Sequence, residues 1–231
     1  MKSLIVLILL LICATPAAAE DYLPLETGNF WSYVTENGDH EMRVVAGRVP
    51  VLQGAPYAIE HPISVNDQGL VNYWSLGPDG DVLLWGFFRD GWGYVYQPPV
   101  VLVDAPLVVG KNWSTTLDII SLPDTTYFTT AEFQYFAAEA QDVTVPAGTF
   151  SSFGIGSPDP DTKSLLDGRY TLWGTKVNDK ANADLTWYSL GVGIVQEKYS
   201  DLLMLETYTD QPVATEVTTW GGVKALYRGN D

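Results

Sequence analysis

An aromatic row stands near the middle of the sequence, in LLWGFFRDGWGYVYQPP, residues 83–99. In an extended strand, Trp92, Tyr94 and Tyr96 lie on one face and glycines alternate with them on the other. Such a row can stack on sugar rings or line an apolar pocket, and the glycines allow a ligand or a neighbouring strand to come close. Packing in a hydrophobic core is the favoured alternative. The ligand-binding candidates are Trp85, Trp92, Tyr94 and Tyr96.

Two acidic turns carry the residue types of a calcium site. PDPDTKSLLDG holds Asp159, Asp161 and Asp167, and carboxylate oxygens are the ligands that calcium prefers. Their spacing does not match an EF-hand loop, and GPDGD, with Asp79 and Asp81, is equally ambiguous. Ordinary acidic turns are the favoured interpretation, so we expect no cofactor and keep calcium as the alternative.

Catalytic patterns are scarce. His40 and His61 lie in separate strand-like segments without further ligands at zinc spacing. Ser157 and Ser189 lack the G-x-S-x-G pattern of a nucleophile elbow. A glycosidase needs two facing carboxylates about 5–9 Å apart, which a sequence cannot show. We therefore expect no enzymatic activity and keep a glycan hydrolase as a third alternative.

The chain has the pattern of short strands joined by tight turns. Three hairpins are expected, with turns at residues 37–39, 77–80 and 146–148, where Gly, Pro, Asn and Asp gather. Further strands are expected near residues 55–62, 112–120, 126–138, 169–176, 184–189, 193–199 and 202–209. About a dozen antiparallel strands predict a single all-β domain with little helix, in the form of a curved sheet, half-barrel, barrel or sandwich.

One stretch is ambiguous between helix and strand. TAEFQYFAAEA, residues 130–140, contains good helix formers. Its neighbours Tyr127, Phe128 and Thr129 prefer strands. A helix over 130–140 therefore competes with the strand expected at 126–138.

A short motif occurs twice, as PLETGNFWS at 24–32 and PLVVGKNWS at 106–114. The similarity stops after the tryptophan, which argues against duplicated domains. Proline suits the start of a strand, glycine allows positive φ in a turn, and tryptophan brings a large apolar side chain to the core. We interpret both copies as turns that lead into strands, with paired ligand-stacking tryptophans as the alternative. The motif residues are Pro24, Gly28, Trp31, Pro106, Gly110 and Trp113.

Four motifs in order carry a family resemblance: DYLPLETGNFWSY, YQPPVVLVDAPLVVGKNWST, VTVPAGTF with Pro146, Gly148 and Phe150, and TWYSLGVGIVQEKYS. Over residues 21–200 the chain resembles the TapB-like family of secreted bacterial proteins and lipoproteins of unknown function. Leu23 departs from the aromatic residue usual in that family. The resemblance implies a large antiparallel sheet similar to the half-barrel of lipoprotein carriers, and it implies no established activity.

The ends of the chain and its charge bear on location. Residues 1–19 have Lys2, an apolar run and a final Ala-x-Ala, which is typical of a secretory signal peptide. Ile12 fills the position before Cys13 where a lipobox needs a small residue, so lipid anchoring at Cys13 is disfavoured. The net charge of −16 disfavours nucleic acid and anionic membranes as partners.

These observations predict a domain over 20–210 and a tail over 211–231, in which Trp220, Val223 and Tyr227 have helical spacing. The tail is expected to be a short docked helix, with a sorting or docking signal as the alternative. We expect a secreted, periplasmic or extracellular protein without a transmembrane span that binds a lipid or another apolar small molecule. The alternative is an interaction or structural protein of the cell envelope, without a ligand pocket.

Overall fold

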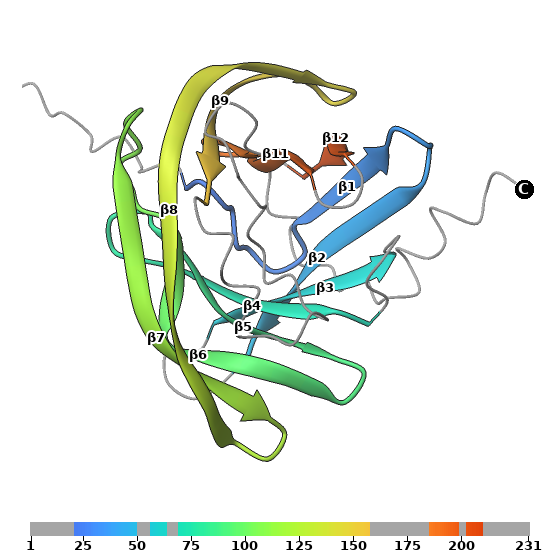
Figure 1. Cartoon of the computed structure of the whole chain (residues 1–231). Coiled ribbons are helices and arrows are strands. Elements are labelled where there is room, and N and C mark those ends of the chain that lie inside the picture. The colour runs from blue at the N-terminus through green and yellow to red at the C-terminus, as the bar shows by residue number, and fades with distance from the viewer. Residues whose placement is uncertain (1–20, 50–55, 64–68, 158–184, 199–201, 210–231) are drawn as a thin grey trace, which may run out of the picture.

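Twelve antiparallel strands form the part of the chain that the computed structural model describes, residues 21–49, 56–63, 69–157, 185–198 and 202–209 (Figure 1). The predicted signal segment 1–19, the tail 211–231 and the strand expected at 169–176 lie outside these residues. The strands are β1 (Phe30–Thr35), β2 (His40–Arg48), β3 (Tyr57–Ile63), β4 (Val71–Leu76), β5 (Val82–Arg89), β6 (Trp92–Val103), β7 (Asn112–Leu122), β8 (Thr126–Val145), β9 (Gly148–Gly156), β10 (Thr186–Ser189), β11 (Gly193–Lys198) and β12 (Leu202–Tyr208).

The strands close into one barrel in which each pairs with its neighbours along the chain. Closure comes from β1, whose Tyr33 pairs with Glu41 of β2 on one side and with Leu205 of β12 on the other. The predicted all-β class is confirmed. The curved sheet closes into a complete barrel, so none of these strands has an unpaired edge.

Turn chemistry explains where the strands end. The three predicted hairpin turns connect β1 to β2, β4 to β5 and β8 to β9. A further turn between β5 and β6 consists of Asp90 and Gly91, whose φ angles of 51° and 89° are both positive. That is the backbone of a type I′ turn, which Asp-Gly favours and which matches the twist of a hairpin.

The helix considered over residues 130–140 is wrong, because this segment lies inside β8 (Figure 1). Its buried residues alternate: Ala131, Phe133 and Tyr135 point into the core. A period of two lets one face of a strand fill the barrel, whereas a helix would break the pairing with both β7 and β9. Tertiary packing thus overrides the helix propensity of alanine and glutamate.

Aromatic and aliphatic side chains from the whole barrel fill its interior as one core. The segment ahead of β1 contributes Tyr22, Leu23 and Leu25, all buried. It is tied to the β10–β11 turn by a hydrogen bond from the Gly191 amide to the Asp21 carbonyl at 2.9 Å. In Figure 1 this blue segment crosses the barrel before the first strand starts. The end that carries the β10–β11 turn is therefore covered by the chain itself.

Both copies of the repeated motif lead into strands. Gly28 and Gly110 have φ angles of 94° and 89°, in the left-handed region that glycine adopts easily. Trp31 then lies buried at the start of β1, with its indole N–H donating to the Val192 carbonyl. Trp113 in β7 is half-buried, donates to the Val101 carbonyl at 2.8 Å and stacks on Tyr135. These contacts are structural and bring the two tryptophans to different parts of the barrel wall.

Of the remaining motif residues, Pro24 accepts a hydrogen bond from the Asn29 side chain through its carbonyl. Pro106 follows a cis peptide bond in the β6–β7 loop. Pro146 and Gly148 form the β8–β9 turn, and Phe150 packs edge-on against Tyr208 at a centroid distance of 5.9 Å.

The glycines near the aromatic row allow two strands to approach each other. A Cβ atom on Gly93 of β6 would lie 2.1 Å from the Phe87 carbonyl oxygen of β5. A Cβ atom on Gly86 would meet the Tyr94 carbonyl oxygen at the same 2.1 Å. The close approach that these glycines permit is therefore that of a neighbouring strand.

Replacing Gly93 by Ala is expected to lower the free energy of unfolding by about 1–3 kcal/mol, because the new methyl group overlaps backbone that must shift. Gly91→Asn is the matched control, since asparagine tolerates positive φ and a Cβ there meets nothing within 4 Å. Urea denaturation of the three proteins measures both effects. Equal stability of the Gly93→Ala variant and the parent protein would contradict the close approach.

Candidate functional site

Four aromatic side chains gather at one end of the barrel: Phe87 of β5, Trp92 and Tyr94 of β6, and Phe128 of β8. We call them the aromatic cluster. Phe87 meets Trp92 and Tyr94 edge to face, at centroid distances of 5.4 and 5.7 Å. Tyr94 reaches Phe128 at 5.3 Å. Aromatic pairs favour such tilted and edge-on geometries, and each contributes about 0.5–1.5 kcal/mol beyond its buried area.

The cluster lies on the inward face of the barrel wall. Tyr94 and Tyr96 are two residues apart on β6, and Tyr96 pairs with Ile119, which is fully buried in the core. Successive odd and even positions of a strand point to opposite faces, so Tyr94 shares the inward face of Tyr96. The cluster therefore continues the core up to the end of the barrel.

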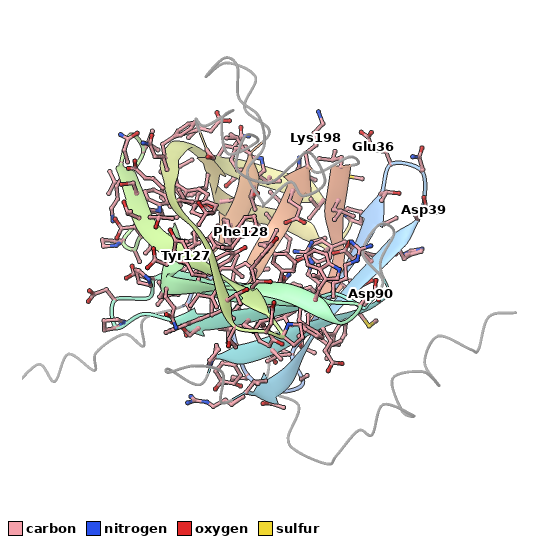
Figure 2. The ribbon with its side chains drawn as sticks, turned by 60° about the horizontal axis from the view of Figure 1, so that its bottom comes forward. Glu36, Asp39, Asp90, Tyr127, Phe128 and Lys198 are labelled. Atoms are coloured by element: carbon pink, nitrogen blue, oxygen red, sulfur yellow. The ribbon has the colours of Figure 1, made fainter. Side chains whose placement is uncertain are left out.

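A register shift in the β7–β8 pairing adds Phe128 to the cluster. Ile119 pairs with Thr129 and Ile120 pairs with Tyr127, so Phe128 has no partner in β7. Its ring turns to Tyr94 instead and stays 44% exposed, while Tyr127 beside it is 64% exposed. Figure 2 shows both residues on β8, with Asp90 of the β5–β6 turn on the same side of the molecule. The cluster thus packs against the core on one side and is accessible to solvent on the other.

The four ligand-binding candidates from the sequence do not all come together. Trp92, Tyr94 and Tyr96 share the inward face, as the period of two predicts. Trp85 lies on the other face, where its indole N–H donates to the Ser75 hydroxyl at 2.8 Å. Phe87 and Phe128 take its place beside the aromatic row, and the sequence analysis missed both. The aromatic content of FF at 87–88 was visible, but the register shift that turns Phe128 inward was not.

A second feature that the sequence analysis missed is a buried group of charges, Glu41 and Arg43 of β2 and Glu197 of β11, which we call the ionic cluster. The Arg43 guanidinium donates to Glu41 at 2.7 Å and makes a short bidentate contact with Glu197. It also lies over the Tyr33 ring, 4.7 Å from its centroid. Glu41, Arg43 and Val45 alternate along β2 on the inward face, so charged residues inside an alternating strand were the available signal.

Burial sets the electrostatics of the ionic cluster. The pKa of the Glu197 carboxyl is raised because burial disfavours its charged form, and the charge of Arg43 opposes this rise. Burial also raises the pKa of Tyr33 and of Tyr188, so both phenols stay protonated. With two carboxylates and one guanidinium, the ionised cluster carries one net negative charge inside the barrel.

The other candidates from the sequence occupy structural positions. His40 contacts Glu206 at 3.2 Å on the surface, and Ser189 donates to the Ser151 carbonyl at 3.0 Å. Asp81 accepts a hydrogen bond from the Ala105 amide at 2.8 Å, which ties the β4–β5 turn to the β6–β7 loop.

The remaining candidates lie at the surface, at the end of a strand or outside the described residues. Asp79 is an exposed turn residue and Ser157 is buried at the end of β9. The side chain of His61 and the residues Asp159, Asp161 and Asp167 lie outside the described part. Within the described part, no group of three His, Cys, Asp or Glu residues could hold a metal ion.

Comparison with known proteins yielded one distant structural likeness. A predicted lipoprotein from Parabacteroides distasonis ATCC 8503, of solved structure, is similar over 83% of this chain and 99% of that chain, with 11% identity and a TM-score of 0.34. Neither protein-family models nor curated proteins gave a match. The TapB-like resemblance therefore stays a prediction. Nothing in the described residues is a helix with the length and apolar character that crossing a membrane requires.

Replacing Arg43 by Met is expected to lower the free energy of unfolding by about 3–5 kcal/mol at pH 8, because two buried carboxylates lose their shared cation. The loss should be smaller at pH 5. A folded-state pKa raised above the ordinary 4.5 of Glu197 means that the folded state holds the proton more tightly. The charge of Arg43 opposes this rise in the parent protein, so its removal raises the Glu197 pKa further. The variant therefore loses more stability than the parent protein as the pH rises from about 4.5 through the folded-state pKa.

Urea denaturation of the Arg43→Met variant at both pH values measures this dependence. The double variant Arg43→Met, Glu197→Gln is the control and should recover part of the loss at pH 8, since it removes one unpaired charge. The same loss at pH 5 and pH 8 would show that the cluster does not carry the charges described.

Proposed function

We propose that this protein is an exported, non-enzymatic binding protein of the cell envelope that holds an apolar, ring-containing ligand at the aromatic end of its barrel. The observation that carries the proposal is the aromatic cluster, which faces inward and yet is partly exposed. Export rests on the signal-like residues 1–19, and the envelope on the resemblance to secreted proteins and lipoproteins.

The physical chemistry of the cluster supports a ligand with a flat apolar face. Closed antiparallel barrels commonly take ligands at one end, where interior side chains meet solvent. Phe128 and Trp92 offer ring faces and edges to such a ligand, and covering them removes apolar surface from water at about 25 cal/mol per Å². The opposite end is covered by Tyr22, Leu23 and Leu25, which supports the aromatic end as the place of entry.

The state of the buried carboxylates supports a role without catalysis. Among the described residues, the buried carboxylates are Glu41 and Glu197, and both are engaged by Arg43. A glycosidase pair must face a sugar and a water molecule across a cleft. Two carboxylates that share one guanidinium inside a packed core do not offer that arrangement.

An interaction protein is the second candidate, because three apolar residues are exposed at the opposite end of the barrel. Val108 and Val109 lie in the β6–β7 loop and Leu190 in the β10–β11 turn. A contiguous exposed apolar patch marks a site of contact with another protein, whereas single exposed apolar residues are ordinary. The aromatic cluster remains the stronger basis, because its rings contact one another and extend the core, whereas the loop residues are scattered.

Replacing Phe128 by Ala is expected to weaken the binding of naphthalene about two- to twelvefold, since the ring contributes one aromatic contact of about 0.5–1.5 kcal/mol. Equilibrium dialysis with naphthalene, an uncharged probe made only of rings, measures the dissociation constant. Tyr127→Ala is the matched control, because the neighbouring ring is more exposed and its hydroxyl contacts Thr130. This variant should bind like the parent protein. Absence of naphthalene binding, or equal losses in the two variants, would overturn the proposed site.

A further inference from the structure

One buried hydroxyl below the aromatic cluster has no hydrogen-bond partner among the described residues. Tyr96 is 1% exposed, and its phenolic oxygen neither donates nor accepts a bond there. Leaving a buried polar group unsatisfied costs about 1–3 kcal/mol. Another buried tyrosine, Tyr33, donates to the Ile194 carbonyl at 3.0 Å. A phenylalanine at position 96 would fill the same space without the cost, so the hydroxyl itself needs an explanation.

The position of this hydroxyl connects it to the aromatic end. Tyr96 follows Tyr94 by two residues on the inward face of β6, a step of about 7 Å along a strand. Its ring packs against Phe133 at a centroid distance of 6.1 Å, deeper in the core than the cluster. A molecule of two fused rings that packs on Tyr94, the ring that contacts both Trp92 and Phe128, spans a similar length. Its inner end would then come within reach of the Tyr96 oxygen.

The charges of the barrel decide which polar group suits this place. The phenols of Tyr135 and Tyr94 are the ionisable neighbours of Tyr96, and burial keeps Tyr96 protonated by raising its pKa. When both of its carboxyls are ionised, the ionic cluster adds one net negative charge to the interior, and the whole chain carries −16. A carboxylate or phosphate would have to give up its hydration against this field. An uncharged oxygen that exchanges a hydrogen bond with a phenol meets no such penalty.

We infer that the ligand is a neutral amphipath, with an apolar ring system held by the aromatic cluster and a hydroxyl or carbonyl oxygen that hydrogen-bonds the Tyr96 hydroxyl. This inference rests on the proposed function and adds the chemical class of the ligand to it. Tyr96 acts as the polar anchor, and Phe87, Trp92 and Phe128 hold the apolar part. The depth of Tyr96 sets the distance between the two parts of the ligand.

The test compares three probes of one shape by equilibrium dialysis: naphthalene, 2-naphthol and 2-naphthoate. The parent protein should bind 2-naphthol more tightly than naphthalene by about five- to tenfold, the value of one hydrogen bond. It should bind 2-naphthoate more weakly than 2-naphthol. Tyr96→Phe should reduce 2-naphthol binding to the level of naphthalene, leave naphthalene binding unchanged, and keep or raise the melting temperature.

Tyr33→Phe is the matched control, because it removes a buried hydroxyl that is already satisfied. It should lower the melting temperature and leave the preference for 2-naphthol intact. Tight naphthalene binding with no preference for 2-naphthol, or a preference that survives Tyr96→Phe, overturns the inference and leaves the proposed function standing. Failure of naphthalene to bind, alone or together with the other two probes, overturns the proposed function itself.

Discussion

Closure of the barrel through the pairing of β1 with β12 is the constraint on which the rest of the structure depends. Once the ring of strands is closed, each strand has one face that must fill the interior, and a period of two assigns its residues to that face. Closure also brings Arg43 of β2 to Glu197 of β11, although the two lie 154 positions apart in the chain. The ionic cluster is therefore a consequence of the closed ring.

The interior has two parts with different chemistry. Around β1, β2 and β11, charges and phenols satisfy one another inside the core, as Arg43 does with its two carboxylates. Around β5 to β8, rings pack on rings and continue to a partly exposed surface. In the first part, the ion pairs of Arg43 connect β2 to β11, two strands that come together only when the barrel closes. In the second part, aromatic rings remain partly exposed to solvent, so their apolar surface is available to a ligand. The proposed binding site lies there for this reason.

The sequence predicted the features that depend on local chemistry. Turn residues located the hairpins at residues 37–39, 77–80 and 146–148, and alternation located most strands and the shared face of Trp92, Tyr94 and Tyr96. It failed over residues 130–140, where helix propensity competes with a tertiary pairing that only the closed barrel reveals.

The candidate site was only partly predictable for a related reason. Phe128 joins the cluster through a register shift, and Trp85 leaves it because the β5–β6 pairing is irregular between Leu84 and Gly86. Such irregularities depend on contacts between strands, so no window of sequence contains them. The ionic cluster also contains Glu197 of β11. The alternation of Glu41 and Arg43 along β2 does not predict this distant partner.

The central claim is that the inward aromatic face at one end of the barrel binds the ligand. Tryptophan indole N–H signals in nuclear magnetic resonance spectra, followed during titration with 2-naphthol, test it most directly, because Trp92 and Trp85 are close in sequence but lie on opposite faces. The account predicts a saturable shift of the Trp92 signal while the Trp85 signal stays in place. A shift of Trp85 without Trp92, or no shift of either signal at saturating probe, would contradict it.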